Sequence, residues 1–109
     1  MSKHICTWPE RIPGDPVHDL IIAYLTVDIQ KSPAWAAELV AKINEVRSGK
    51  LSSWERPGNA YYLHVYPQFV VIEDDYMEES EIIKIPVATF ASAASAWHDT
   101  INNCRAGDK

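Results

Sequence analysis

A regular spacing of apolar residues between positions 32 and 49 predicts the clearest helix in the chain. Ser32-Pro33 is a typical helix start, because the hydroxyl can accept a hydrogen bond from a free amide and proline loses nothing at the first helical position. Gly49 suits the left-handed conformation of a C-terminal cap. The apolar residues recur at spacings of four, four and three, which indicates one stripe packed on a sheet. They are Trp35, Leu39, Ile43 and Val46.

A period of two follows and predicts three consecutive antiparallel strands. After the Gly58-Asn59 turn, residues 60–66 alternate, with Tyr62, His64 and Tyr66 on one face of the strand. The next strands are expected at residues 69–73 and 81–85. Pro86 then opens a last helix, whose apolar residues recur at spacings of four, three and four. These are Phe90, Ala94, Trp97 and Ile101.

The N-terminal part of the chain has a weaker pattern. Residues 1–16 include three prolines and a glycine among few apolar side chains, so we expect a flexible arm there. Residues 17–29 are rich in β-branched and bulky side chains, which favours an extended strand over a helix. Residues 50–57 are expected to form a loop.

Together these elements predict an α+β fold, a two-layer sandwich with a mostly antiparallel sheet of about four strands and two helices on one face. The 109 residues fit a single domain at 17–109, preceded by the arm at 1–16. One face of the sheet would stay open. Which alternating set points away from the helices is left undecided, and Tyr62, His64 and Tyr66 are either an exposed binding surface or strand residues half covered by the arm.

The charge of the chain is concentrated in one segment, residues 73–81, which we call the acidic run. The whole chain has 15 acidic and 10 basic residues and a net charge of −5, so outside the run it is nearly neutral. Clustered carboxylates steer a cationic surface into encounter, although the run is equally compatible with a solvated loop. Its acids are Glu73, Asp74, Asp75, Glu78, Glu79 and Glu81, with Tyr76 and Met77 between them.

Composition excludes several classes of protein. No apolar stretch reaches the roughly 20 residues of a membrane span, and the N-terminus lacks the apolar region of a signal peptide, so we expect a cytoplasmic protein. Cys6 and Cys104 have no metal-ligand spacing, and we expect neither a disulfide nor a cofactor. The negative charge argues against binding nucleic acid.

Motifs for catalysis are lacking, and we expect no enzyme. There is no phosphate-binding glycine loop, His-x-x-x-His pair or Gly-x-Ser-x-Gly elbow. The acidic run lacks the glycine and the ligand order of a calcium loop. A small enzyme using His64 as a general base beside the acids is kept as a minor alternative.

The segment Gly49 to Tyr61, with Trp54-x-x-x-Gly58-Asn59-x-Tyr61 leading into a hairpin, resembles immunity proteins of bacterial contact-dependent growth-inhibition systems. The Ser53-Trp54-x-Arg56-x-Gly58 stretch and acidic connector also resemble the YacL-type small proteins. The likeness covers roughly residues 28–101.

The first resemblance implies a cytoplasmic protein that binds the C-terminal domain of a toxin and inhibits it, with no contact to nucleic acid or membrane. A nuclease toxin has a basic substrate groove, which an anionic surface could occupy. We therefore expect a toxin-neutralising binder that uses the acidic run together with Tyr62, His64 and Tyr66. The alternative, from the second resemblance, is a housekeeping interaction or regulatory module with an unknown partner.

Overall fold

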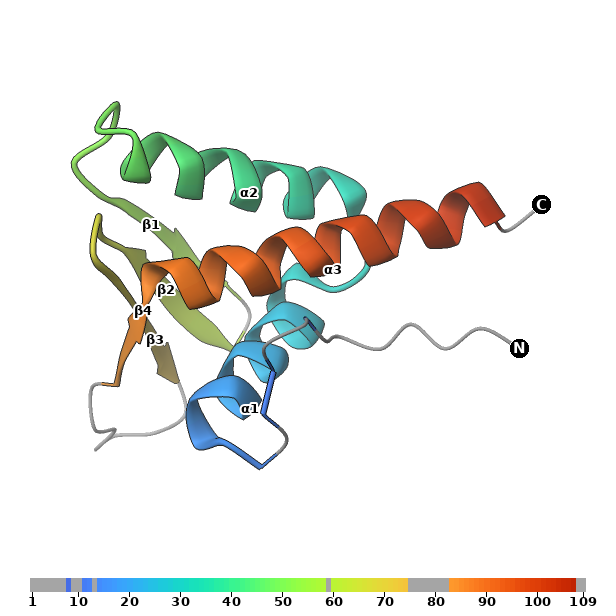
Figure 1. Ribbon diagram of the computed structural model, residues 1–109, viewed down its shortest axis with the longest axis horizontal. Coiled ribbons are helices and arrows are strands. Elements are labelled where there is room, and N and C mark those ends of the chain that lie inside the picture. Colours follow the sequence, from blue (N-terminus) through green and yellow to red (C-terminus); the bar gives the residue numbers. More distant parts are fainter. Residues whose placement is uncertain (1–7, 9–10, 13, 59, 75–82, 108–109) are drawn as a thin grey trace.

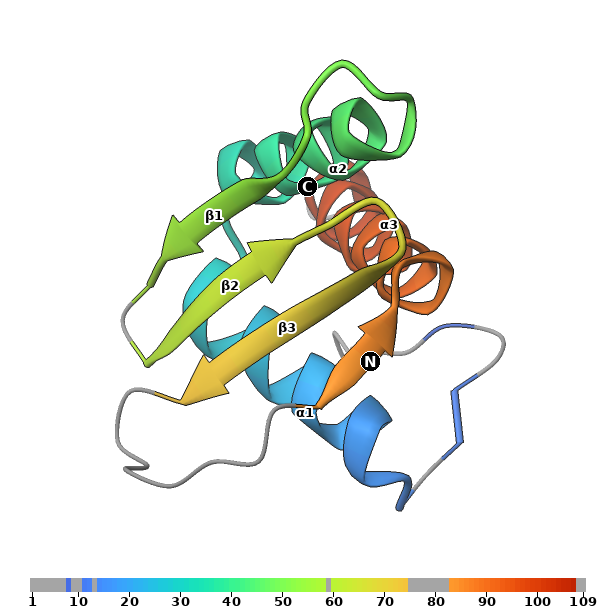
Figure 2. The same cartoon turned by 90° about the vertical axis from the view of Figure 1, so that its left-hand side faces the viewer.

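The computed structural model describes residues 8, 11–12, 14–58, 60–74 and 83–107. In chain order its elements are α1 (Pro16–Tyr24), the π-helical η1 (Leu25–Ile29), α2 (Pro33–Arg47), β1 (Trp54–Pro57), β2 (Tyr61–Val65), β3 (Phe69–Asp74), β4 (Lys84–Pro86) and α3 (Val87–Gly107). The strands form one antiparallel sheet in the order β1-β2-β3-β4. This confirms the predicted α+β class. Figures 1 and 2 show the helices on one side of the sheet.

The strand predicted at residues 17–29 is wrong, because this segment is helical, and the described fold therefore has three α-helices rather than two. Asp15 caps α1 by accepting hydrogen bonds from the amides of Val17 at 2.8 Å and His18 at 3.2 Å, and Pro16 occupies the first helical position. The buried residues of this segment are separated alternately by three positions and by one, which places them on one side of a helix. They are Ile21, Tyr24, Leu25, Asp28 and Ile29.

Asp28, on η1, links this helical segment to the sheet. Its side chain is 1% exposed, and its two carboxylate oxygens accept hydrogen bonds from the amides of Ala60 and Tyr61, both at 3.0 Å. The Gly58 amide in turn donates to the Tyr61 carbonyl at 2.9 Å. A buried carboxylate is stable only where donors replace its water, and these two amides do so. The connection between β1 and β2 is thereby fixed against η1.

The loop expected at residues 50–57 contains a strand, β1, which pairs with β2 along its whole length. Trp54 and Arg56 are half-buried while Glu55 and Pro57 are exposed, which is the alternation of a strand with one face on the core. The sheet order places β1 at an edge. A proline is tolerated there because an edge strand has amides that no neighbour needs.

The predicted boundaries of α2 are confirmed, but one member of its stripe is wrong. The Ser32 hydroxyl accepts from the Trp35 amide at 3.2 Å, and Gly49 has a φ of 89° after the last turn. Ala36, not Trp35, is buried beside Leu39 in the core. Trp35 is 42% exposed, and the guanidinium of Arg56 lies 5.3 Å from its ring centre. The buried side of α2 therefore differs from the predicted stripe only in its first member.

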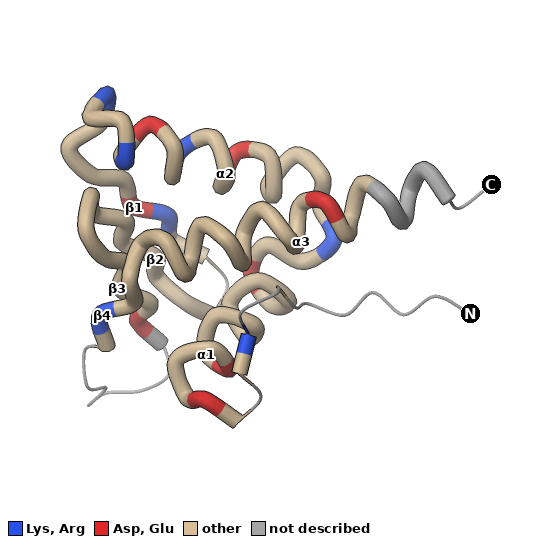
Figure 3. Tube along the Cα trace, in the orientation of Figure 1, with Lys and Arg blue, Asp and Glu red and all other residues tan. Residues whose placement is uncertain are grey.

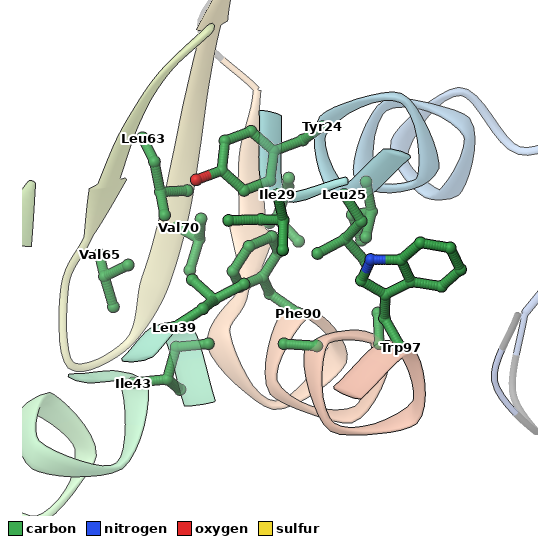
Figure 4. Close-up of a cluster of buried hydrophobic side chains, with 14 of the residues drawn as sticks. Tyr24, Leu25, Ile29, Leu39, Ile43, Leu63, Val65, Val70, Phe90 and Trp97 are labelled. Carbon is green, nitrogen blue, oxygen red and sulfur yellow. The ribbon is translucent and has the colours of Figure 1, made fainter. Parts of the chain in front are cut away.

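The core lies between the sheet and the helices (Figure 4). β2 and β3 contribute Leu63, Val65 and Val70, all fully buried. The predicted stripe of α3 is confirmed, since all four of its residues are buried. Trp97, 2% exposed, also donates its indole N–H to the carbonyl of Gln30 at 2.7 Å. This bond ties α3 to the end of η1, where Gln30 has a positive φ of 59°.

Trp8 lies within the segment expected to be an arm, yet it belongs to the core and is 4% exposed. Its ring centre is 5.1 Å from that of His18 on α1. Two backbone donors hold the same region together, because the Arg11 amide donates to the Trp8 carbonyl at 3.0 Å and the Ile12 amide donates to Nδ1 of His18 at 2.8 Å. Trp8 thus contributes to packing around α1.

The last strand is shorter than predicted. β4 spans Lys84–Pro86, whereas residues 81 and 82 of the expected strand lie outside the described residues. Pro86 ends β4, and α3 begins one residue later than predicted, at Val87. α3 is 21 residues long, but no helix in the described part of the chain has the length and apolarity needed to cross a membrane.

Candidate functional site

We call the sheet face that points away from the helices the open face (Figure 2). It carries the predicted aromatic residues. On β2, Leu63 and Val65 are fully buried on the helix side, so Tyr62 and His64 project from the opposite side. Strand pairing identifies the residues that share this side. The side chains of the open face used below are Glu55, Tyr62, His64, Tyr66, Phe69, Val71, Glu73 and Lys84.

Two cross-strand rows organise the open face. The longer row crosses all four strands, from Glu55 on β1 through His64 and Val71 to Lys84 on β4. The shorter row runs from Pro57 on β1 through Tyr62 on β2 to Glu73 on β3. Directly paired residues of antiparallel strands stand about 4.5–5.5 Å apart at their Cβ atoms, so neighbours in a row contact each other. An acid therefore stands at one edge of the sheet and a cation at the other.

Three rings form a nearly parallel ladder along β2. The ring centres of Tyr62 and His64 are 4.6 Å apart with 16° between their planes. Those of His64 and Tyr66 are 6.4 Å apart with only 2° between the planes. Phe69 continues the aromatic surface, its ring centre 4.9 Å from that of Tyr66. The predicted grouping of Tyr62, His64 and Tyr66 on one face is confirmed, and their rings face outward from the core.

Carboxylates on both neighbouring strands hold this ladder. The Tyr62 hydroxyl donates to Oε1 of Glu55 at 2.6 Å. That hydrogen bond is the main reason that the pKa of Tyr62 is raised, and desolvation and the negative charges of Glu55 and Glu73 act in the same direction. Nε2 of His64 contacts Oε2 of Glu73. The rings are thus fixed by polar contacts rather than by packing alone, which limits the entropy that they would lose on binding.

Among the described residues, the other imidazole nitrogen of His64 has no hydrogen-bond partner. Nδ1 is buried. Oε2 of Glu55 lies 3.9 Å from it, which is beyond hydrogen-bond distance. The ring lies between one acid on β1 and one on β3. This arrangement makes His64 the polar centre of the open face.

A shallow hollow of about 220 Å³ lies beside the ladder, and we call it the Val71 hollow. Val71, only 7% exposed although it lies outside the main core, forms its base. The strand pairing places His64 and Lys84 on either side of Val71. Nζ of Lys84 lies 4.9 Å from the ring centre of Phe69. The hollow is lined by His64, Tyr66, Phe69, Val71, Glu73 and Lys84.

Most of the predicted acidic run cannot be placed. Glu73 and Asp74 are the last two residues of β3, and Glu73 belongs to the open face. The remaining predicted site residues of the run lie outside the described residues. They are Asp75, Tyr76, Met77, Glu78, Glu79 and Glu81. In Figure 3 acidic and basic residues alternate along α2, and an acidic residue lies near the end of β3.

Four residues of the open face were not predicted from the sequence as site residues: Glu55, Phe69, Val71 and Lys84. Glu55 lies in a segment that was predicted to be a loop. The alternation of Trp54 and Arg56 with Glu55 was the available signal, but it spans only four residues and ends at a proline. Lys84 interrupts an apolar run at a position that, in register, faces the same side as His64.

The open face carries groups that can bind another molecule. It offers carboxylate acceptors, one ammonium group and ring faces, all on rigid strands. Within the described ranges, no three His, Cys, Asp or Glu side chains are grouped so that they could hold a metal ion. Such a surface can bind another molecule by stacking and by charge-assisted hydrogen bonds.

Comparison with known proteins assigns no family. No family model matches the sequence, and neither the curated proteins nor the solved structures include a match.

Proposed function

We propose that this chain is an immunity protein that binds a basic toxin domain, of the nuclease type, through the open face and the adjoining acidic run. The observation that carries the proposal is the ladder of Tyr62, His64 and Tyr66, held between Glu55 and Glu73 on a sheet face opposite the helices. The inhibitory role comes from the resemblance of the Trp54 to Tyr61 segment to immunity proteins. One experiment tests the binding surface and the inhibitory role together.

Ring residues on rigid strands favour protein recognition. Tyrosine is enriched among the residues that contribute most to protein interfaces, because it buries a large area with few rotatable bonds. Here Tyr62 is already oriented by its bond to Glu55, and the His64 ring by its contact with Glu73. A partner would therefore meet a preformed surface, and less binding free energy would be lost in ordering side chains.

Charge selects a basic partner. Glu55 and Glu73 place two carboxylates on the open face, against one ammonium group from Lys84. The acidic run begins at Glu73, and in the sequence further carboxylates follow the end of β3. Electrostatic attraction of this kind accelerates association more than it slows dissociation, and salt weakens it.

The test is co-expression with the toxin domain encoded by a neighbouring reading frame, combined with association kinetics at low and high salt. The variant Glu55→Gln with Glu73→Gln removes both carboxylates of the open face. The matched control, Glu38→Gln with Asp99→Asn, makes the same charge change at exposed positions on α2 and α3. We expect slower association, a smaller salt dependence and weaker growth protection for the first pair only.

A six-amide variant of the acidic run extends the same test to residues 73–81. It should slow association further without lowering the stability of the free chain, since exposed like charges repel. Equal kinetics and full protection for both variants and their control would refute the proposal. A stable complex with a host protein, in the absence of any neighbouring toxin, would instead assign the open face to a housekeeping interaction module.

A further inference from the structure

We propose that the Val71 hollow is a binding site for a single arginine side chain of the partner protein. This inference rests on the proposed function in one respect only, namely that the partner is basic. The hollow measures about 220 Å³, below the 300–1,000 Å³ of sites for drug-sized molecules, so it suits one side chain rather than a free metabolite. Its lining determines which side chain fits best.

The base and one wall of the hollow match the two parts of an arginine. Val71 offers an apolar base for the three methylene groups of the stem. The rings of His64 and Tyr66 stand nearly parallel, 6.4 Å apart, and present flat faces to a planar group. A guanidinium stacks on such faces because it is planar, delocalised and weakly hydrated, whereas the lysine ammonium is a compact and strongly hydrated charge.

Glu73 supplies the acceptor at one end of the hollow. Only Oε2 of its carboxylate is engaged by His64, and a carboxylate can accept several hydrogen bonds. Arginine can donate two parallel hydrogen bonds to one carboxylate, which fixes its orientation as well as adding binding free energy. Stem, plane and charge of the arginine thus each have a counterpart in the lining.

Lys84 lines the other end of the hollow, where its positive charge would attract an anion and repel a cation, so this residue distinguishes the two kinds of occupant. Its ammonium group is over Phe69, and Phe69 is four residues from Glu73 on β3, about 13 Å along an extended strand. The guanidinium at Glu73 therefore stacks on the His64 ring, the stem passes over Val71 beside the Tyr66 ring, and the ammonium at Phe69 lies at the opposite end of the hollow. The two like charges still repel, so removing the charge of Lys84 should strengthen arginine binding. It would weaken the binding of an anion.

The test uses the full chain and two small probes, N-acetyl-arginine amide and N-acetyl-lysine amide, titrated at constant ionic strength. Chemical shifts of the His64 and Tyr66 ring protons report occupancy of the hollow. We expect saturable shifts with a Kd in the millimolar range for the arginine probe, and binding at least about threefold weaker for the lysine probe. The toxin is not needed, so this result is separable from the proposed function.

Two substitutions make the test specific. Tyr66→Leu removes one parallel ring and should abolish the shifts at His64, while Lys84→Gln, at an exposed position, should tighten arginine binding. Trp35→Leu is the control, because it removes an exposed ring on α2 and should change neither shift nor affinity.

Equal affinity for both probes, no response at His64, or weaker binding by Lys84→Gln would overturn the arginine site. If the protein does not bind the arginine probe but still binds the toxin, the arginine site is wrong and the proposed function stands. A protein that binds the arginine probe but no toxin loses the proposed function and keeps the site.

Discussion

Gly58 leaves open the space that the Asp28 carboxylate occupies, since a β-carbon at position 58 would lie 2.2 Å from Oδ2 of Asp28. The glycine is thus required by close approach and not by a left-handed backbone. Asp28 cannot move away cheaply, because its two oxygens hold the amides of Ala60 and Tyr61. The contact joins two segments that are 30 residues apart in the sequence.

Gly58→Ala should therefore destabilise the fold by about 1–3 kcal/mol, the usual cost of inserting a group into a packed site. Asp28→Ala removes the clash but leaves two amides without acceptors, which costs a similar amount. The two effects should be strongly non-additive, and Gly58→Ala should cost little in the Asp28→Ala background. Urea denaturation of both single variants and the double variant measures the coupling. Additive losses would show that the two residues do not meet.

Trp97→Ala should lower the free energy of unfolding by about 3–5 kcal/mol, because a large buried ring and its hydrogen bond to Gln30 are both lost. The chain provides its own control in Trp35→Ala, which removes a ring that is 42% exposed and should cost less than about 1 kcal/mol. Chemical denaturation distinguishes the two. A denaturation midpoint of Trp97→Ala equal to that of the wild type would mean that α3 is not packed as described.

Trp8→Ala should also destabilise the fold, but by less than Trp97→Ala. Its ring is buried in the core, and its indole nitrogen is buried without a hydrogen-bond partner among the described residues. Removing that unpaired group offsets part of the lost packing. Thermal unfolding of Trp8→Ala and of a chain that lacks residues 1–7 provides the measurement. A melting temperature unchanged by Trp8→Ala would show that packing around α1 does not depend on this ring.

Tyr24 should make the fold sensitive to alkali. Burial raises the pKa of its hydroxyl above the ordinary value of 10.0, and the nearby Arg56 guanidinium opposes this only in part. A group whose pKa is raised on folding stabilises the protein below the unfolded pKa, and this stabilisation is lost as pH rises above about 10. Tyr24→Phe should reduce that alkaline loss.

Near neutral pH, Tyr24→Phe should change stability little, because no hydrogen bond of normal geometry to the buried Tyr24 hydroxyl is found in the described part of the chain and Arg56 interacts with it only weakly while it is uncharged. Stability measured between pH 7 and pH 11 tests both statements. The same alkaline slope in wild type and variant would exclude Tyr24 as its source.

Glu55→Gln should lower the pKa of Tyr62 toward 10.0, since the hydrogen bond to the carboxylate is the main cause of the increase. Tyrosinate absorbance or a ring-proton titration by NMR follows this residue directly. An unchanged Tyr62 titration would show that its hydroxyl does not donate to Glu55 in solution.

The sequence predicted those parts of the fold in which local and tertiary signals agree. In α2, Ser32-Pro33 and Gly49 mark the two ends of a single helix. In β2, the period of two places Tyr62 and Leu63 on opposite faces of the sheet. The helical segment of residues 16–29 is not predicted from the sequence, because its β-branched side chains favour a strand and obscure the helical spacing of its apolar residues. Asp15-Pro16 is nevertheless the same type of start as Ser32-Pro33, an acceptor side chain followed by proline.

Within the described part of the chain, the site residues that the sequence predicts lie along β2 and at the end of β3. His64 and Tyr66 could be placed on one face because the alternation lies within one strand. The hollow could not be predicted, since it depends on the register that brings Val71 and Lys84 beside His64. Register is a tertiary property, and β1 is too short to reveal by pattern that Glu55 reaches Tyr62.

The alternation along β2 and β3 also has an evolutionary consequence. Leu63, Val65 and Val70 maintain the core, whereas His64, Tyr66 and Phe69 on the same strands contribute nothing to it. Substitutions of the second set can accumulate without loss of the scaffold. A lineage of such chains could therefore change its partner as fast as that partner changes, by exchanging side chains on one surface while inheriting the other unaltered.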